Sequence, residues 1–189
     1  WFDERGIAIP NLAELLDLVA LGTVADVVPL DANNRILTWQ GMSRIRAGKC
    51  RPGIKALLEV ANRDPQKLAA SDLGFALGPR LNAAGRLDDM SVGVALLLCD
   101  NIGEARVLAN ELDALNQTRK EIEQGMQVEA LTLCEKLERS RDTLPGGLAM
   151  YHPEWHQGVV GILASRIKER FHRPVIAFAP AGDGTLKGS

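Results

Sequence analysis

Four short segments in the first hundred residues carry apolar side chains at the spacing of an α-helix. The first segment follows Asn11 and Glu14, which have the spacing of a capping box, and Gly22 is the expected end of its helix. The apolar stripe of this segment consists of Leu12, Leu15, Leu16 and Val19. This pattern predicts an amphipathic helix that turns one face to a core.

The other three segments have their own start and stop signals. Pro52 is the expected first residue of a second helix, with apolar positions at Ile54, Leu57, Leu58 and Ala61. Ser71 or Asp72 is the expected cap of a third helix, which runs through Leu77 and ends before Pro79. A fourth helix is expected from Met90 to Cys99. The first hundred residues are therefore predicted to form a helical layer of short pieces.

A single long, charged helix is predicted from Glu104 to about Arg141, because this stretch has no proline and keeps apolar residues at spacings of three and four. The apolar seam consists of Leu108, Leu112, Leu115, Ile122, Met126, Leu133 and Leu137, with Arg119 and Glu129 as its polar positions. The favoured interpretation is a helix that links two domains. An ordinary surface helix of one domain is the alternative, since seam periodicity does not separate the two.

The pattern changes again after Pro145-Gly146-Gly147, which marks a boundary. A strand from Leu148 to Tyr151, a helix from Gly158 to Phe171, a strand from Val175 to Ala179 and a turn at residues 182–184 are expected in turn. Strand, helix and strand within about 30 residues form a βαβ unit. The predicted fold class is therefore mixed α/β, with a mostly helical part (1–102), a long linking helix (103–143) and a small α/β part (144–189).

Composition limits the classes of protein that need to be considered. With 46% apolar and 24% charged residues the chain can bury a sizeable core, and its formal charge of −2 means that any basic surface has to be local. Three widely spaced cysteines argue against a disulfide framework and favour the reducing cytoplasm. The sequence shows neither a membrane span nor a signal peptide, and a first residue other than Met suggests an excised fragment.

The first candidate for chemistry is Asp26, the only carboxylate in an otherwise apolar run from Gly22 to Leu30. Burial of a lone ionised carboxylate costs several kcal/mol unless the group is paired or bound to a metal ion. From the pattern alone Asp26 either caps a turn, meets a core arginine or serves a functional site.

The second candidate is the segment from Gly78 to Arg86, in which Arg80, Asn82 and Arg86 alternate with small residues. The planar fork of arginine suits phosphate oxygens, and small neighbours leave room for a bulky anion. The segment lacks the spacing of a Walker loop. A tight turn with two solvated arginines is the alternative interpretation.

The third candidate begins at His152 and His156. These residues do not form a zinc-protease motif, because Pro153 stands where that motif has its glutamate. Instead, the glycines from 158 to 161 are expected to open a helix whose N-terminal amides favour an anion, with His156 in front and Ser165 and Arg166 two turns on. A hydrogen-bonded structural role for His156 is the alternative.

The fourth candidate is a stretch between Asp31 and Glu59 that contains no acidic residue but six basic ones, namely Arg35, Arg44, Arg46, Lys49, Arg51 and Lys55. Such a stretch suits a surface that follows phosphates, although most charge runs are solvated faces. Trp39 lies within it, either as a platform for a base or, as we favour, as a core tryptophan.

Taken in order, four segments resemble bacterial exonucleases of the RecJ type, which belong to the DHH phosphodiesterase family. The segments are LDLVALGTVADVVPL, LGPRLNAAGRLDD, LDALNQTRKEIE and WHQGVVGILASRIKERFHRPVI. The resemblance implies a DHH catalytic domain, a linking helix and a DHH-associated domain, and an enzyme that degrades single-stranded DNA from the 5′ end in recombination and repair. It also implies a two-metal site for Mn²⁺ or Mg²⁺.

The resemblance implies roles for individual residues as well. Asp26 matches the last metal-binding aspartate of the catalytic domain. Residues that match positions facing DNA are Arg80, Asn82, Arg86, His156, Ser165, Arg166, Lys187 and Ser189. The other metal-binding aspartates and the Asp-His-His triplet of the family occur nowhere in this sequence. We therefore expect the parent protein to be the enzyme and this chain to be inactive alone.

Two other functions remain open within the resemblance. One is a pyrophosphatase or a nanoRNA or cyclic-dinucleotide phosphodiesterase of the same superfamily, which the basic stretch and the Gly78 to Arg86 segment disfavour. The other is a non-catalytic RecJ-like scaffold, which the intact Asp26 disfavours. For the parent, expected partners are single-stranded DNA and, less directly, a single-strand-binding protein and a helicase. A monomer without membrane contact is expected.

Overall fold

The computed structural model describes residues 5–6, 11–140, 145–182 and 184–189. Its contacts divide the chain into two compact units, Trp1–Ala84 with Asp89–Ala114, and Gly85–Asp88 with Leu115–Ser189. The first unit is helical and the second contains the sheet. No described helix is both long enough and apolar enough to cross a membrane.

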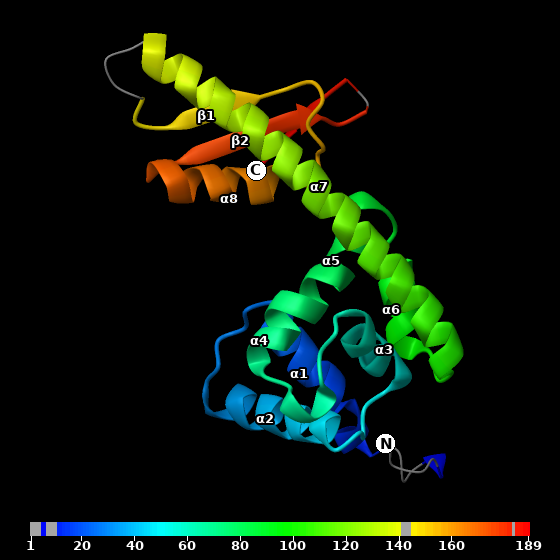
Figure 1. The fold of residues 1–189 in the computed structure, drawn as a ribbon. Coiled ribbons are helices and arrows are strands. Elements are labelled where there is room, and N and C mark those ends of the chain that lie inside the picture. The colour runs from blue at the N-terminus through cyan, green and yellow to red at the C-terminus, as the bar shows by residue number, and fades with distance from the viewer. Residues whose placement is uncertain (1–4, 7–10, 141–144, 183) are drawn as a thin grey trace. The chain divides into compact units, whose positions relative to one another are not determined.

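The first unit is built from short helices, as the apolar pattern predicted (Figure 1). In chain order they are η2 (Leu12–Leu15), α1 (Leu16–Ala25), α2 (Ala32–Arg46), α3 (Pro52–Val60), η3 (Pro65–Lys67), α4 (Ala70–Asp72), η4 (Leu73–Leu77), the start of α5 (Gly78–Leu87), α6 (Ser91–Leu98) and the start of α7 (Ile102–Ser140). The core consists of large apolar side chains without solvent exposure, among them Ile45, Ile54, Leu57, Leu58, Leu73, Leu77 and Leu96. The starts predicted at Pro52 and near Met90 are confirmed.

The first predicted helix differs from the structure at both ends. Asn11 caps a short 3₁₀ helix, its side chain accepting a hydrogen bond from the amide of Ala13 at 3.2 Å. The α-helix then continues through Gly22 to Ala25, so the predicted stop at Gly22 is wrong. Mid-helix glycine costs only about 1 kcal/mol, which the apolar packing of α1 offsets.

The predicted helix end before Pro79 is also wrong, because one helical run crosses this proline. Proline lacks an amide hydrogen and its ring clashes with the carbonyl four residues earlier. Just ahead of Pro79 the helix widens into the π-helical turn η4, where the Gly78 amide donates to the carbonyl of Leu73, five residues back. This wider turn lets α5 continue to Leu87 instead of forming the tight turn considered for the segment.

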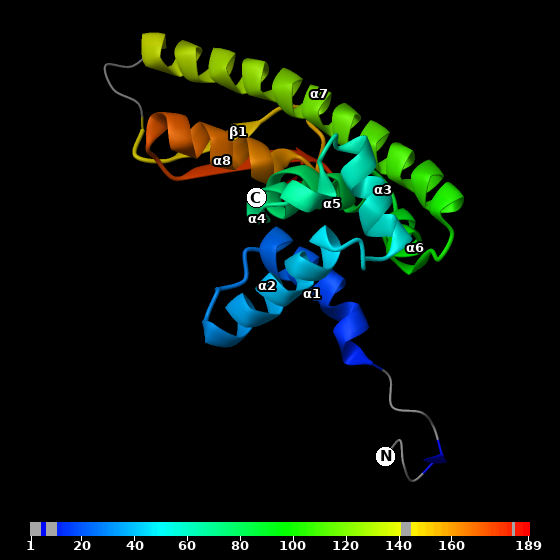
Figure 2. The ribbon, with the colours of Figure 1, turned by 60° about the horizontal axis from the view of Figure 1, so that its bottom comes forward.

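The predicted long helix is confirmed as α7, shown as one continuous ribbon in Figure 2, although Arg141 lies outside the described residues. Residues 102–114 belong to the first unit and residues 115–140 to the second. The side chains of α7 that are fully buried are mostly small ones that the seam did not include, at Ala105, Ala109, Ala130 and Cys134. Small side chains allow close approach. Of the seam leucines, Leu112 is fully buried, whereas Leu108 and Leu115 remain partly exposed.

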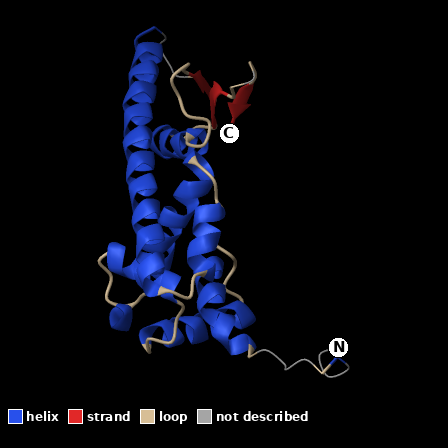
Figure 3. Ribbon diagram, turned by 90° about the vertical axis from the view of Figure 1, so that its right-hand side faces the viewer, coloured by secondary structure: helices blue, strands red, loops and turns tan. Residues whose placement is uncertain are grey.

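The second unit contains a three-stranded sheet in the order β1-β2-β3, drawn in red in Figure 3. β1 (Leu148–Tyr151) runs parallel to β2 (Val175–Pro180), α8 (Val160–Phe171) connects them, and β3 (Leu186–Gly188) is antiparallel to β2. This confirms the predicted βαβ unit, with α8 starting two residues later than expected. The middle residue of the predicted turn, Asp183, lies outside the described residues.

One face of the sheet forms the core of the second unit. Leu148 and Met150 from β1 and Ala177 and Ala179 from β2 are buried against α8 and the second part of α7. These helical contacts come from Met126, Ala130, Cys134, Val160, Leu163, Ala164 and Ile167. The shared core fixes where α7 and α8 lie along the sheet, and so fixes the side chains on their outer faces.

Candidate nucleic-acid interface

Asp26 ends helix α1 at a strained turn. The amide of Val28 donates to the carbonyl of Thr23 at 3.0 Å and that of Val27 to Val24 at 3.2 Å, the pattern of a Schellman motif. Val27 therefore takes the left-handed conformation, with φ of 54°, at a position that usually favours glycine. Strain of this kind is found at functional sites when the surrounding structure holds it.

The Asp26 side chain is exposed and makes no hydrogen bond or ion pair with any described residue. Asp26 is the C-cap residue of α1 through its backbone amide, but its side chain neither caps the turn nor meets an arginine among the described residues. Among the described residues no three His, Cys, Asp or Glu side chains gather closely enough to hold a metal ion. Asp26 fits a metal site only as a single oxygen ligand, and further ligands would have to come from elsewhere.

Asp17 is the carboxylate that meets a core arginine. Its side chain is 1% exposed and accepts hydrogen bonds from the backbone amide of Arg51 at 2.9 Å and from the Arg51 Nε at 3.2 Å. Arg51 also donates to the carbonyl of Leu97 at 3.1 Å. The sequence contained a signal for this buried pair, since Asp17 interrupts the apolar stripe of α1. Arg51 therefore stabilises the fold, and we no longer count it among the basic residues that could contact phosphates.

The rest of the basic stretch is partly structural too. Arg46 donates to the carbonyl of Leu68 and Arg35 to that of Leu30. Trp39 has 60% of its surface exposed, so the expectation of a core tryptophan is wrong.

An apolar pocket of about 400 Å³ in the first unit is lined by Thr23, Val24, Ala25, Val27, Val28, Leu30, Ala70, Ser71, Gly74 and Phe75.

The three polar residues predicted on the Gly78 to Arg86 segment have different surroundings. Arg80 is only 15% exposed, and its Nε forms an ion pair with Asp113 at 2.7 Å while NH1 donates to the carbonyl of Ala76. Asn82 and Arg86 are exposed. An incoming phosphate would therefore compete with Asp113 at Arg80 but would meet a more accessible guanidinium at Arg86.

In the second unit an open cleft of about 470 Å³ lies along the outer side of α8, and we call it the α8 cleft. Its lining brings together four of the predicted contact residues with three others, namely Arg86, Gly161, Ile162, Ser165, Arg166, Glu169 and Ser189. Ser165 and Arg166 are exposed on α8. Ser189 is held by paired backbone hydrogen bonds to Ala177 at 2.9 and 3.0 Å. The cleft offers two guanidinium groups and two hydroxyls within one concave surface.

Two glycines allow the walls of the α8 cleft to approach closely. A Cβ on Gly158 would lie 2.0 Å from the carbonyl oxygen of Arg86, and one on Gly161 would lie 2.9 Å from the Ser189 Oγ. Arg86 also donates from NH1 to the carbonyl of Gly158 at 3.1 Å. Because Gly158 has no side chain, Arg86 can lie against the segment that leads into α8.

His156 and Lys187 do not line the α8 cleft. The Nδ1 of the half-buried His156 accepts a hydrogen bond from the Gly158 amide at 3.1 Å, which is the structural role left open for it. Lys187 lies exposed on β3. Contacts of these two residues with nucleic acid stay predictions.

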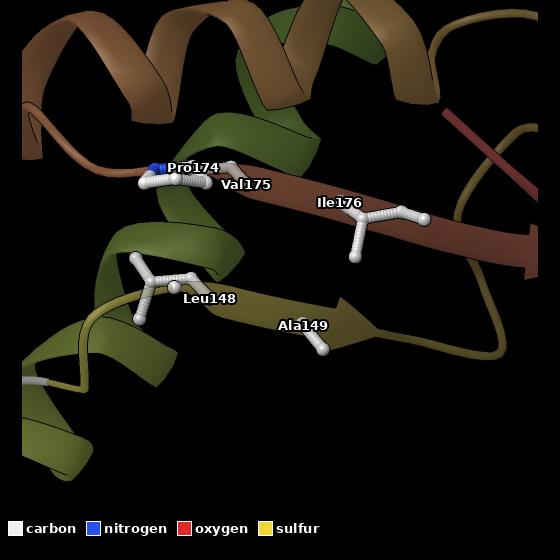
Figure 4. Close-up of a pocket in the computed structure, with 6 residues that line it drawn as sticks. Leu148, Ala149, Pro174, Val175 and Ile176 are labelled. Carbon is white, nitrogen blue, oxygen red and sulfur yellow. The ribbon is translucent and has the colours of Figure 1, made fainter.

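A second pocket of this unit is apolar and shallow. It covers about 290 Å³ at the start of β1 and β2, where Leu148, Ala149, Pro174, Val175 and Ile176 lie side by side (Figure 4). Its lining has no charged or polar side chain, so it offers nothing to a phosphate.

The shifted pKa values lie away from the α8 cleft. A hydrogen bond from Arg106 lowers the pKa of Glu59 and raises that of Arg106 itself. Burial raises the pKa of the Cys50 and Cys134 thiols, and a backbone hydrogen bond from Ser91 lowers the pKa of Asp89. These groups therefore do not bear on the α8 cleft.

Solved structures of RecJ proteins share this fold. RecJ from Thermus thermophilus in complex with Mg²⁺ has a TM-score of 0.77 and 36% identity, over 94% of this chain and 27% of that one. The complex with Mn²⁺ gives the same TM-score and identity. An exonuclease RecJ bound to manganese has a TM-score of 0.76 over 94% of this chain. The mixed, helix-rich architecture with a small sheet is thus that of RecJ-type proteins.

At the level of sequence the resemblance is closer still. The chain is 98% identical over all 189 residues to the single-stranded-DNA-specific exonuclease RecJ of Escherichia coli, and 38% identical over 177 residues to that of Bacillus subtilis. It spans 33% of the length of the first of these relatives and 22% of the second. No family model matches the chain. The predicted resemblance to RecJ is confirmed along the whole sequence.

Proposed function

We propose that this chain is the central part of a metal-dependent exonuclease that hydrolyses single-stranded DNA from the 5′ end. The observation that carries the proposal is 98% identity over all 189 residues to a protein named for this activity. Because the chain spans about a third of that relative, the activity belongs to the longer protein. Mn²⁺ or Mg²⁺ is the proposed cofactor, since solved RecJ structures hold these ions.

The proposed role of Asp26 is that of one metal ligand. Divalent ions would lower the pKa of a bound water and stabilise the charge that develops on the phosphodiester oxygens. Asp26 supports this role because its carboxylate is exposed and has no partner among the described residues. The remaining ligands are proposed to come from other parts of the longer protein.

The α8 cleft is proposed to hold backbone phosphates. Arg86 and Arg166 supply charge and donors, and the hydroxyls of Ser165 and Ser189 supply further hydrogen bonds. Asn82, His156 and Lys187 are proposed as outlying contacts. Arg80 is proposed to reach a phosphate only in exchange for Asp113.

The proposed domain assignment keeps the predicted ranges. Residues 1–102 would end a DHH catalytic domain, residues 103–143 would form the linking helix, and residues 144–189 would begin the DHH-associated domain. The enzyme is proposed to act as a cytoplasmic monomer in recombination and repair, with a single-strand-binding protein and a helicase as further partners.

A comparison of substrates tests the proposal. The full-length protein should release nucleotides from a 5′-labelled single strand in the presence of Mn²⁺, and should act far more slowly on duplex DNA, pyrophosphate and cyclic dinucleotides. Preference for pyrophosphate or dinucleotides would replace the proposal with the phosphodiesterase alternative. Binding of single strands without hydrolysis of any substrate would favour a scaffold.

A further inference from the structure

Glu123 on helix α7 connects arginines from two helices of the second unit. Its side chain is 13% exposed. One carboxylate oxygen, Oε1, accepts a hydrogen bond from the Arg166 Nε on α8 at 3.2 Å. The other, Oε2, accepts from NH1 of Arg119 on α7 at 2.5 Å. Each oxygen of one largely buried carboxylate is thus assigned to a different guanidinium group.

Arg119 holds the Glu123 carboxylate in place from the side of α7. The Arg119 side chain is only 11% exposed, and its Nε and NH2 reach the Oδ1 of Asn116 at 3.4 and 3.2 Å. Asn116 itself is 2% exposed. Because three of its nitrogens have partners, Arg119 is not free to turn toward a ligand, and Glu123 is fixed by a partner that cannot easily move.

This arrangement leaves the two terminal nitrogens of the Arg166 guanidinium, its outer edge, available to a ligand. Glu123 takes the Nε hydrogen, so the two terminal nitrogens are not needed for that contact. The only other ion pair of Arg166 among the described residues, from NH1 to Glu169, is 3.7 Å long, and Glu169 is 63% exposed. A long ion pair between exposed groups contributes little and is easily replaced by another anion. Arg166 is therefore held firmly at Nε by Glu123 and only weakly at its terminal nitrogens by Glu169.

We propose that Glu123 is a positioning residue, which orients the Arg166 guanidinium toward a phosphate in the α8 cleft. This inference rests on the proposed function, because it requires Arg166 to contact phosphate. Long arginine side chains have many rotamers, and fixing one of them beforehand removes the cost of ordering it when the ligand binds. Loss of the Glu123 charge would leave a cleft that is more positive but less ordered.

Two effects of Glu123→Gln follow, in opposite directions. Affinity for a single strand should stay the same or rise slightly, because the removal of a negative charge from a basic cleft offsets the renewed cost of ordering Arg166 on binding. Turnover should fall about tenfold, the size of coupling expected between directly bonded charged groups. A residue that only joins α7 to α8 would lower the melting temperature without this division between binding and turnover.

The test is a double-mutant cycle in the full-length protein. Turnover of a 5′-labelled single strand with Mn²⁺ is measured for the wild type, Glu123→Gln, Arg166→Ala and the double variant, and Kd is measured with Ca²⁺ to suppress cleavage. If Glu123 acts through Arg166, the double variant should turn over no more slowly than Arg166→Ala alone. Glu121→Gln is the matched control, since Glu121 is exposed on the same helix, and it should behave as the wild type.

Each outcome decides a different point. Wild-type behaviour of Arg166→Ala would remove Arg166 from the proposed function. An impaired Arg166→Ala beside a normal Glu123→Gln would leave that function standing and overturn the positioning role. If the losses of turnover in the two single variants multiply in the double variant, Glu123 acts independently of Arg166 and is a structural residue only. If Glu123→Gln fails to fold, Glu123→Asp serves instead, and the same non-multiplying result is expected.

Discussion

The predicted DNA-contacting arginines differ in what already occupies their guanidinium groups. Arg80 is largely buried and paired with Asp113 at 2.7 Å, whereas exposed Arg86 gives one hydrogen bond to the Gly158 carbonyl. A charge that is already paired releases fewer counterions when it meets a phosphate. The two arginines of one segment are therefore expected to contribute unequally to binding.

We predict that Arg86→Ala in the full-length protein weakens binding of all single strands alike and reduces the slope of log affinity against log salt by about 0.7. Arg86→Lys should restore the slope but only part of the affinity, because lysine lacks the planar fork. Arg80→Ala should chiefly lower the melting temperature. The measurement is affinity for an oligonucleotide across a salt series with Ca²⁺. If log affinity falls with log salt at the same slope for the wild type and Arg86→Ala, the proposed contact is excluded.

Asp26→Ala in the full-length protein should reduce turnover by about two orders of magnitude or more, while affinity for single strands changes little. The physical reason is that a metal ligand serves the chemical step rather than the grip on the backbone. Because the Asp26 side chain is exposed and has no partner among the described residues, stability should be unaffected. Glu111→Ala, which removes another exposed carboxylate, is the control. Cleavage at the wild-type rate by Asp26→Ala would show that Asp26 binds no catalytic metal.

At the level of secondary structure, the α8 cleft depends on how closely α5 and α8 backbone segments approach within the second unit. The Cβ of an alanine at Gly158 would be placed 2.0 Å from the Arg86 carbonyl oxygen. Neither backbone can give way without moving Arg86 or the start of α8. The glycine therefore sets the position of a proposed phosphate contact as well as the packing of a helix.

Gly158→Ala is predicted to destabilise the second unit by about 1–3 kcal/mol, the usual range for overpacking. Gly125→Ala is the matched control, because Gly125 lies within α7 with open space around its Cα. That change should be neutral or stabilising by up to about 1 kcal/mol, through helix propensity alone. Denaturant unfolding followed by circular dichroism measures both. Equal effects of the two substitutions would mean that the close approach is relieved at no cost.

Considered as a whole, the molecule carries a proposed phosphate cleft, but its described residues include only a single candidate metal ligand. No cluster of three potential ligands occurs among the described residues, and the chain spans about a third of its E. coli relative. Two-metal hydrolysis needs several carboxylate or imidazole groups around ions roughly 3.5–4 Å apart. Binding and cleavage are therefore expected to separate when the chain is studied alone.

We predict that the purified 189-residue chain releases no nucleotides from a 5′-labelled single strand with Mn²⁺ or Mg²⁺. The full-length protein, prepared in the same way, should degrade the strand under those conditions and serves as the positive control. Manganese-dependent hydrolysis by the chain alone, lost in Asp26→Ala, would show that this chain completes a metal site by itself.

The sequence alone determined the features that depend on neighbours along the chain. Apolar spacing and start signals located the helices from Pro52 and near Met90, the long helix α7 and the βαβ unit, because 3.6- and 2-residue periods are local properties. Long motifs of the sequence also identified the resemblance to RecJ. Their length made the match specific, although no period or spacing reveals what Asp26 does.

Tertiary structure alone decided which polar groups are free and which are paired. Asp17 rather than Asp26 meets a core arginine, Arg80 is paired with Asp113, and a π-helical turn carries the chain across Pro79. The Glu123 carboxylate joins Arg119 on its own helix to Arg166, which lies 43 residues beyond Glu123 in the sequence. Such pairings depend on distances through space between separate elements, and the energy of a charged group is set by those distances and its burial. The linear order of residues contains neither quantity.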